Sequence, residues 1–265
     1  MNFTRISGLL LRQWYLFKDN PTRVFQIFAW ILLEMISYGF LSNYVTGLTA
    51  VNFTLIFLGC ILVWEFLIRV MNGVTVAFFE DVWSRNFLNI FASPLTLSEY
   101  LTGLVITSIA TSTLGLIAML ILAGLGFGLN IGFFGLALIP FFLVLFLMGI
   151  ALGILGVAIV LRFGPSSEWF IWPIPAILSP FCGVLYPLTV LPHWMQFVGK
   201  ILPPSYVFEN MRTIASGGAF DGRAFLISLV LVLLYLALAY TLFRVIFRRA
   251  VRTGLLARYS AENVS

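Results

Sequence analysis

Three ionisable residues stand well inside long apolar runs, where a charge is costly. Glu34 lies in the run 24–43, and Glu65 and Arg69 lie in the run 53–79. Inside a membrane each would cost at least about 2.5–3.5 kcal/mol if it were unpaired. Counted at the helical rise per residue, Glu34 and Arg69 reach similar depths in two antiparallel helices. We therefore predict a Glu34–Arg69 ion pair that Glu65, one turn from Arg69, shares; the pair either fixes helix register or contacts a substrate.

The other chemically versatile residues are too scattered to suggest a catalytic or metal site. His193 is the only histidine, and Cys60 and Cys182 both lie in apolar runs. An intramembrane enzyme would need His, Asp, Ser or Cys side chains that converge at one depth. We expect both thiols to act as small hydrophobic groups. The sequence also lacks a Gly-x-x-x-x-Gly-Lys-Ser/Thr phosphate loop, so we predict no catalytic residue, no metal and no cofactor bound by this chain.

The composition places the chain in a membrane. Of its 265 residues, 61% are hydrophobic and 9% are charged, and the mean hydropathy is +1.06. Soluble domains carry about 25% charged residues. A spanning helix needs about 20 mainly apolar residues, and six runs qualify: 24–43, 53–79, 98–127, 132–161, 168–188 and 224–246. We predict an all-α polytopic membrane protein, a single domain over 1–265 with a six-span bundle at 21–246.

The basic residues indicate the orientation of this bundle. Four of them precede the first span and five arginines end the chain: Arg5, Arg12, Lys18 and Arg23, then Arg244, Arg248, Arg249, Arg252 and Arg258. The loops at 44–52 and 128–131 carry no charge. The positive-inside rule predicts both termini, including a basic tail at 247–265, on the cytoplasmic side of a cytoplasmic (inner) membrane. Topology thus explains the net charge of +5, and we expect no nucleic-acid partner.

A polar segment at 80–94 separates the second and third spans. Trp83, Phe87, Ile90 and Phe91 recur at helical spacing, while Arg85 and Asn89 fall on the opposite face. This pattern predicts a short amphipathic helix, which Pro94 ends. The spacing of Thr96 and Glu99 is that of a capping box, which predicts the start of the third span.

Residues 1–20 form a second amphipathic element. Its apolar stripe is Ile6, Leu9, Leu10, Trp14 and Phe17, interrupted by Gln13. Arg5 and Arg12 share another face. We predict a helix at the membrane interface, which either serves as an anchor alone or also adds a docking surface. The pair Asn20-Pro21 predicts the start of the first span.

The segment from Pro187 to Arg223 is long but far from polar. An apolar stripe over 194–202 is broken by Pro203-Pro204, and a second amphipathic pattern begins at Ser205. Two short helices that re-enter the outer leaflet fit this pattern, because backbone at that depth must be hydrogen-bonded internally. In the fifth span, prolines at 173, 175 and 180 predict a bent helix, either a fixed kink or a wall that bends during transport.

In this order the elements resemble the membrane subunit of an ABC-2 type ATP-binding-cassette exporter along essentially the whole chain. The segment Glu80-Asp81 through Phe91-Ala92-Ser93-Pro94-Leu95 resembles the coupling-helix segment of that family. Leu191-Pro192-His193-Trp194-Met195, with Pro204-Ser205-Tyr206, Glu209 and Arg212, resembles its external helices before the last span. Many members carry Gly-Thr-x-Glu where this chain has Trp83-Ser84-Arg85-Asn86-Phe87, which leaves the cargo undefined.

The resemblance implies the permease subunit of an ATP-driven exporter. Its cargo would be amphipathic or hydrophobic, such as a drug-like molecule, a lipid or a lipid-linked glycan. Two copies of a separate ATPase subunit would hold ATP and Mg, and a second permease copy would complete a homodimer in membrane lipid. The implied ATPase contacts are Trp83, Arg85, Asn86, Phe87 and Asn89, and the implied external gate is Trp194, Tyr206, Glu209 and Arg212.

An ion-gradient-driven secondary transporter is the alternative. Such transporters often contain inverted repeats with discontinuous helices in corresponding halves. We find no repeat that relates residues 1–130 to residues 131–265.

Overall fold

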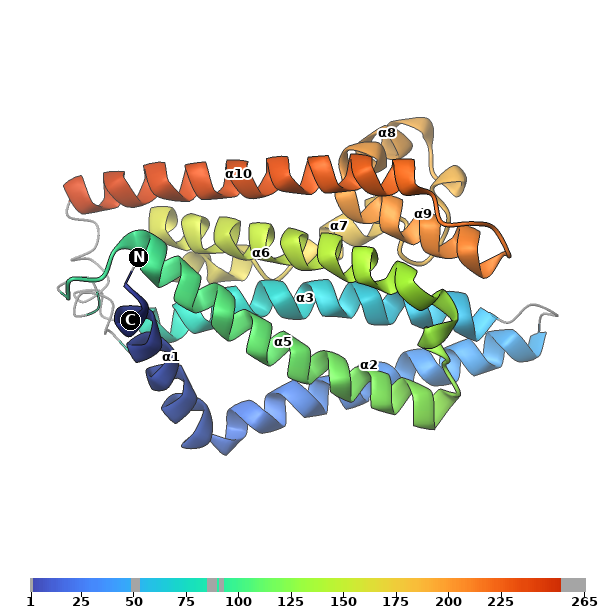
Figure 1. The fold of residues 1–265 in the computed structure, drawn as a ribbon, viewed down its shortest axis with the longest axis horizontal. Coiled ribbons are helices and arrows are strands. Elements are labelled where there is room, and N and C mark those ends of the chain that lie inside the picture. The colour runs from blue at the N-terminus through green and yellow to red at the C-terminus, as the bar shows by residue number, and fades with distance from the viewer. Residues whose placement is uncertain (1, 49–52, 85–89, 91–92, 254–265) are drawn as a thin grey trace.

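The computed structural model of the protein describes residues 2–48, 53–84, 90 and 93–253. All regular secondary structure in these ranges is helical, which confirms the all-α prediction for the described part of the chain. The start of α1 (Phe3–Lys18) follows from local sequence, since the Asn2 side chain accepts a hydrogen bond from the Thr4 N–H at 3.0 Å. After a sharp bend α2 (Pro21–Leu48) begins at its proline, as predicted (Figure 1).

Four long helices form the body of the bundle. They are α3 (Phe53–Trp83), α5 (Leu97–Phe127), α6 (Leu138–Phe163) and α10 (Gly222–Arg252). α3 packs between α5 and α6, and α6 packs between α3 and α10, while α2 covers α3 and α5 on the far side (Figure 1). The predicted capping box of Thr96 and Glu99 starts α5.

Small residues let α3 approach both of its neighbours closely. On α6, a Cβ added at Gly149 would lie 2.8 Å from the Leu67 carbonyl oxygen, and one at Gly153 would lie 3.1 Å from that of Met71. On the other side, Ser108 of α5 donates a hydrogen bond to the Val70 carbonyl at 2.7 Å. Close approach of helix backbones through small residues is the usual way in which membrane helices associate.

Four of the six predicted spans are present as helices that are long and apolar enough to cross a membrane. In the described residues these are Leu55–Trp83, Leu97–Phe127, Ile131–Phe163 and Gly222–Arg252. The third of them joins a 3-10 helix, η1 (Ile131–Ala137), to α6. α2 occupies the place of the first predicted span with 28 residues, but it is not among these four, so its crossing of the membrane stays a prediction.

The single bent helix predicted over 168–188 is wrong. The chain instead forms a 3-10 helix, η2 (Pro165–Phe170), and a nine-residue helix, α7 (Ile174–Cys182). Pro173 and Pro175 lack the N–H groups that a continuous helix requires, and the Ile171 carbonyl accepts a short-range bond from Ile174 N–H at 3.0 Å. Gly183, at φ 67°, then ends α7.

The two short helices predicted after this segment are confirmed. They follow a three-residue 3-10 helix, η3 (Leu188–Val190), and we name them the hairpin: α8 (His193–Ile201) and α9 (Pro203–Ala215). α9 buries Phe208 and Met211 and packs against α3, α6 and α10. The hairpin is therefore part of the packed bundle.

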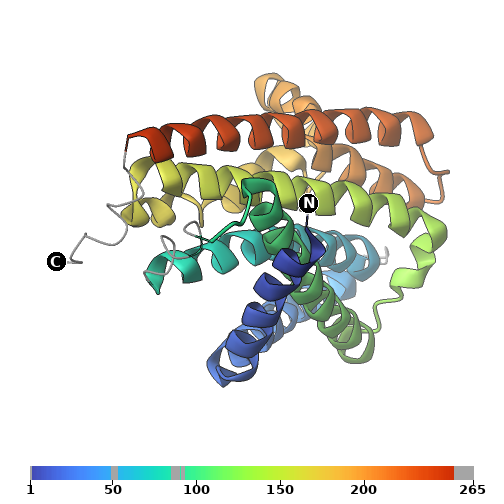
Figure 2. The same ribbon diagram turned by 60° about the vertical axis from the view of Figure 1, so that its left-hand side comes forward.

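The bundle has two distinct ends. The basic end carries α1, the start of α5 and the last turns of α3, α6 and α10, and the hairpin lies at the opposite end (Figure 1). Figure 2 shows α1 side by side with the first turns of α5. The two predicted basic segments, at the start of the chain and in the last turns of α10, are thus at one end of the molecule.

Candidate functional site

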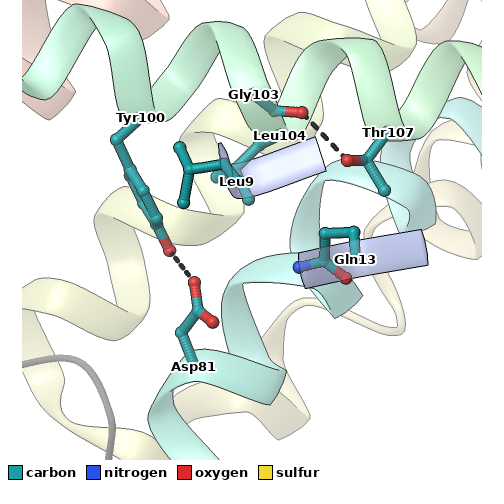
Figure 3. A pocket seen from close by; sticks show the side chains of 7 residues that line it. All are labelled: Leu9, Gln13, Asp81, Tyr100, Gly103, Leu104 and Thr107. Carbon is teal, nitrogen blue, oxygen red and sulfur yellow. Dashed lines mark hydrogen bonds between the residues drawn. The ribbon is translucent and has the colours of Figure 1, made fainter. Parts of the chain in front are cut away.

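The last turns of α3 are held by groups from two other helices. Asp81 is only 1% exposed, and it forms an ion pair with Arg12 of α1. The Tyr100 hydroxyl of α5 donates a hydrogen bond to Asp81 Oδ2 at 2.7 Å (Figure 3). A buried carboxylate is tolerated only when it is paired and hydrogen-bonded. Asp81 therefore fixes α1, α3 and α5 against one another at the basic end.

A second carboxylate, that of Glu99 at the start of α5, also connects α5 to α1. Glu99 accepts hydrogen bonds from the backbone N–H of Thr96 at 2.9 Å and of Asn2 at 2.6 Å. Arg5 Nη1 lies 3.6 Å from Glu99 Oε2, and it also donates to the Pro94 carbonyl. α1 is therefore attached at the point where the 80–94 segment ends.

We call Arg5, Arg12, Asp81, Glu99 and Tyr100 together the clamp. It joins α1 to the last turn of α3, where the 80–94 segment begins, and to the first turn of α5, which follows that segment. Sequence reasoning placed Arg5 and Arg12 on one face of α1 and identified the capping role of Glu99, but it did not find their partners. The only local signal was that this face of α1 and the 80–94 segment are both polar.

A small cavity lies beside the clamp. It measures about 10 Å³, roughly the room that one water molecule needs. Figure 3 shows Gln13 of α1 and Asp81 of α3 among the side chains that line it, and α5 supplies four of the seven lining residues. A cavity of this size could hold a water molecule but no cargo.

Of the predicted ATPase contacts, the structure describes Trp83 alone. Trp83 is the last residue of α3, which runs through the predicted boundary at 79, so it does not begin a separate helix. It is 54% exposed, and its indole N–H donates to Glu168 Oε2 of η2 at 3.0 Å. Four predicted contacts lie outside the described residues: Arg85, Asn86, Phe87 and Asn89.

The structure brings together the three ionisable residues of α2 and α3. Arg69 Nη2 lies 3.5 Å from Glu34 Oε2, as the count of helical turns predicted. Glu65 is 7% exposed and interacts electrostatically with both partners. Gly115 of α5 leaves room for the arginine, since a Cβ there would lie 2.9 Å from Arg69 Cδ. We call Glu34, Glu65 and Arg69 the buried triad.

Two of the four predicted gate residues stabilise the backbone between α7 and α9. Arg212 donates hydrogen bonds to the carbonyls of Tyr186 at 2.9 Å and of Val184 at 3.2 Å, and also to that of Gly183. Its Nη1 lies 3.2 Å from Glu209 Oε1, which accepts the Leu188 N–H at 2.8 Å. The pair thus satisfies backbone groups that no helix satisfies.

The other two gate residues differ in exposure. The Tyr206 hydroxyl donates to the Lys200 carbonyl at 2.8 Å, which ties α9 to α8, and partial burial raises the pKa of this phenol. Trp194 is 63% exposed and makes a T-shaped ring contact with Phe181 of α7. No cluster of three or more His, Cys, Asp or Glu side chains in the described part of the chain could hold a metal ion.

Comparison with known proteins identifies the class to which this fold and site belong. The family model of the ABC-2 type transporter matches residues 4–215, which include α1, the clamp, the buried triad and the hairpin. The chain belongs to the ABC-2 type transporter family. It is a multi-pass membrane protein, the permease component of a transporter of that family. A search of curated proteins found no match.

Proposed function

We propose that this chain is the membrane-spanning permease subunit of an ATP-driven exporter, and that it moves an amphipathic or hydrophobic cargo outward across the cytoplasmic membrane. A separate ATPase subunit, present in two copies, binds ATP and Mg and supplies the energy. A second copy of this chain completes the permease. Six crossings, with α2 and the broken segment 165–190 as the first and fifth, place both termini in the cytoplasm.

The observation that carries this proposal is the clamp. Force applied to the 80–94 segment reaches three helices at once, because Asp81 near its start, Pro94 at its end and Glu99 just beyond it are all bound to α1. A plain connector between two spans needs no such bracing. A segment that transmits a push from an ATPase to the bundle does need it, since a loosely attached segment would move without moving the helices.

The packing of α3 in the bundle can transmit such a force to the opposite end of the molecule. α3 runs from the clamp to the hairpin end, where it packs against α9. Its close contacts with α5 and α6 make it a rigid element, so displacement at Asp81 is carried along its length. In this proposal the hairpin is the external gate, and Glu209 and Arg212 are its frame.

A pull-down from mild detergent tests the coupling role. The bait is the full chain, compared with the double variant Arg85→Glu plus Phe87→Ala. The matched control is Arg223→Glu plus Phe197→Ala, which makes the same chemical changes at two exposed positions away from the clamp. We expect wild type and control to retain an ATPase that hydrolyses ATP, and the 85/87 variant to lose it.

Two results would contradict the proposal. If wild type retains no nucleotide-binding partner, the ATP-driven mechanism fails and the ion-gradient-driven transporter takes its place. If the control loses the ATPase as the 85/87 variant does, then the 80–94 segment has no special role. Native mass spectrometry of the same eluate checks the expected assembly of two permeases with two ATPases.

A further inference from the structure

The buried triad does not balance in charge. It contains two carboxyl groups, Glu34 and Glu65, and one guanidinium, Arg69. If both carboxyls were ionised, the triad would carry a net charge of −1 inside the bundle. A charge in such surroundings either finds a partner or is neutralised.

The neighbouring elements offer no second cation among the described residues. α2 adds Tyr38, which interacts with both carboxyl groups and is neutral as a phenol. α5 faces the triad with Gly115, and α6 has no ionisable residue before Arg162 at its basic end. The charged residues of α9, Glu209 and Arg212, interact electrostatically with Cys60, which lies on α3 nearer the hairpin than Glu65 does.

Hydrogen bonding within the triad is also incomplete. Glu34 Oε2 is buried and has no hydrogen-bond donor, and the Nε and Nη2 atoms of Arg69 have no acceptor. The 3.5 Å contact between Arg69 and Glu34 is an ion pair that is longer than an ordinary hydrogen bond. Glu65, one helical turn from Arg69 on α3, lies within hydrogen-bonding reach of the Glu34 side chain.

We propose that the buried triad binds one proton, which Glu34 and Glu65 share. A protonated carboxyl gains an O–H donor, which supplies the donor that Glu34 lacks. It also leaves one carboxylate for one guanidinium, so the triad becomes neutral. A proton fits where a hydrated metal cation does not, because Glu65 is only 7% exposed. Two carboxyl groups that occupy one site commonly hold a proton between them.

The proton site links transport to pH, which goes beyond the proposed function and does not depend on an ATPase. Glu34 is on α2, whereas Glu65 and Arg69 are on α3, so a movement that separates these helices separates the two carboxyls. The packed arrangement binds the proton and the separated one releases it to water. Lower pH therefore favours the packed arrangement.

Infrared spectroscopy of the purified chain in lipid nanodiscs tests the site directly. A protonated carboxyl group has a C=O absorption that an ionised one lacks, and the frequency of this absorption shifts in deuterated water. At neutral pH we expect this absorption in wild type and its loss in Glu65→Gln. Glu209→Gln, which removes a carboxylate of the hairpin, serves as the control and should retain it. Identical spectra for wild type and Glu65→Gln would overturn the proposal.

Thermal unfolding of the same samples gives an independent measurement. Glutamine is a neutral mimic of a protonated carboxyl, so Glu65→Gln should change the midpoint by less than about 2 °C. Arg69→Gln leaves Glu34 without a counter-charge and should clearly lower the midpoint of thermal unfolding. If Glu65→Gln unfolds as readily as Arg69→Gln, or fails to fold, Glu65 acts as an anion and the proton site does not exist.

Discussion

Asp81 joins three helices through two side-chain contacts. Arg12 reaches it from α1, and Tyr100 reaches it from α5. Both partners come from distant parts of the chain, so the aspartate stabilises an arrangement of helices as well as its own helix. Because it is almost fully buried, the loss of either partner leaves a polar group that water cannot easily reach.

We expect Tyr100→Phe to destabilise the permease by about 1.5–3 kcal/mol, the range for a hydrogen bond to a charged group. The ring and its packing are retained, so the loss reports the hydroxyl alone. Thermal unfolding in detergent measures it. Tyr15→Phe on the exposed side of α1 is the matched control and should change nothing; equal effects of the two substitutions would show that Asp81 does not need this donor.

The sequence predicted the partner of Glu34 but not the partners of Asp81. Glu34 and Arg69 could be paired by counting turns, since both lie in the middle of regular antiparallel helices, where an error of about one turn at a helix end changes their depth little. The partners of Asp81 could not be found this way. Its apparent position in a polar connector suggested exposure, whereas α3 continues through Trp83 because Phe78, Phe79 and Val82 are buried.

The packing of α3 against α6 depends on glycine at the point of closest approach. At Gly149 an added Cβ would lie 2.8 Å from the Leu67 carbonyl oxygen, and backbone cannot yield as a flexible side chain can. The two helices must therefore separate if any larger residue is placed there, and α3 would lose one side of its support.

We expect Gly149→Ala to destabilise the protein by about 1–3 kcal/mol through this overpacking. The matched control is Gly126→Ala on α5, where an added Cβ meets nothing within 4 Å and where alanine is the better helix former. Chemical unfolding of both variants in the same detergent checks the difference. Unchanged stability of Gly149→Ala would mean that α3 and α6 are not held at this distance.

Elements built from a single regular pattern were predictable, and the interrupted one was not. The starts of α2 and α5 follow from Asn20-Pro21 and from the capping box, which act through neighbouring residues. The segment 168–188 is apolar enough for a span, but its prolines remove backbone donors at several points. Whether such a segment bends or breaks depends on which groups hydrogen-bond to its free carbonyls. Here Arg212 binds two of them, those of Val184 and Tyr186, and a residue so far along the chain could not be identified as their partner from the sequence.

For the whole molecule, the separation of basic and hairpin ends makes the proposed topology testable. Cys60 and Cys182 are buried, so wild type provides an unlabelled background. With a membrane-impermeant thiol reagent on intact cells, we expect labelling of Ser216→Cys after α9 and none of Thr253→Cys after α10. Opening the cells should expose the second site. Labelling of Thr253→Cys in intact cells would reverse the orientation.

The contacts of Arg212 also imply an order for synthesis. The carbonyls of Val184 and Tyr186 are satisfied by a residue that the ribosome adds only later. Until residue 212 has been made, the turn after α7 has unmet polar groups and cannot settle in hydrocarbon. The turn after α7 can therefore reach its final form only after α9 has been made and has brought Arg212 to these carbonyls.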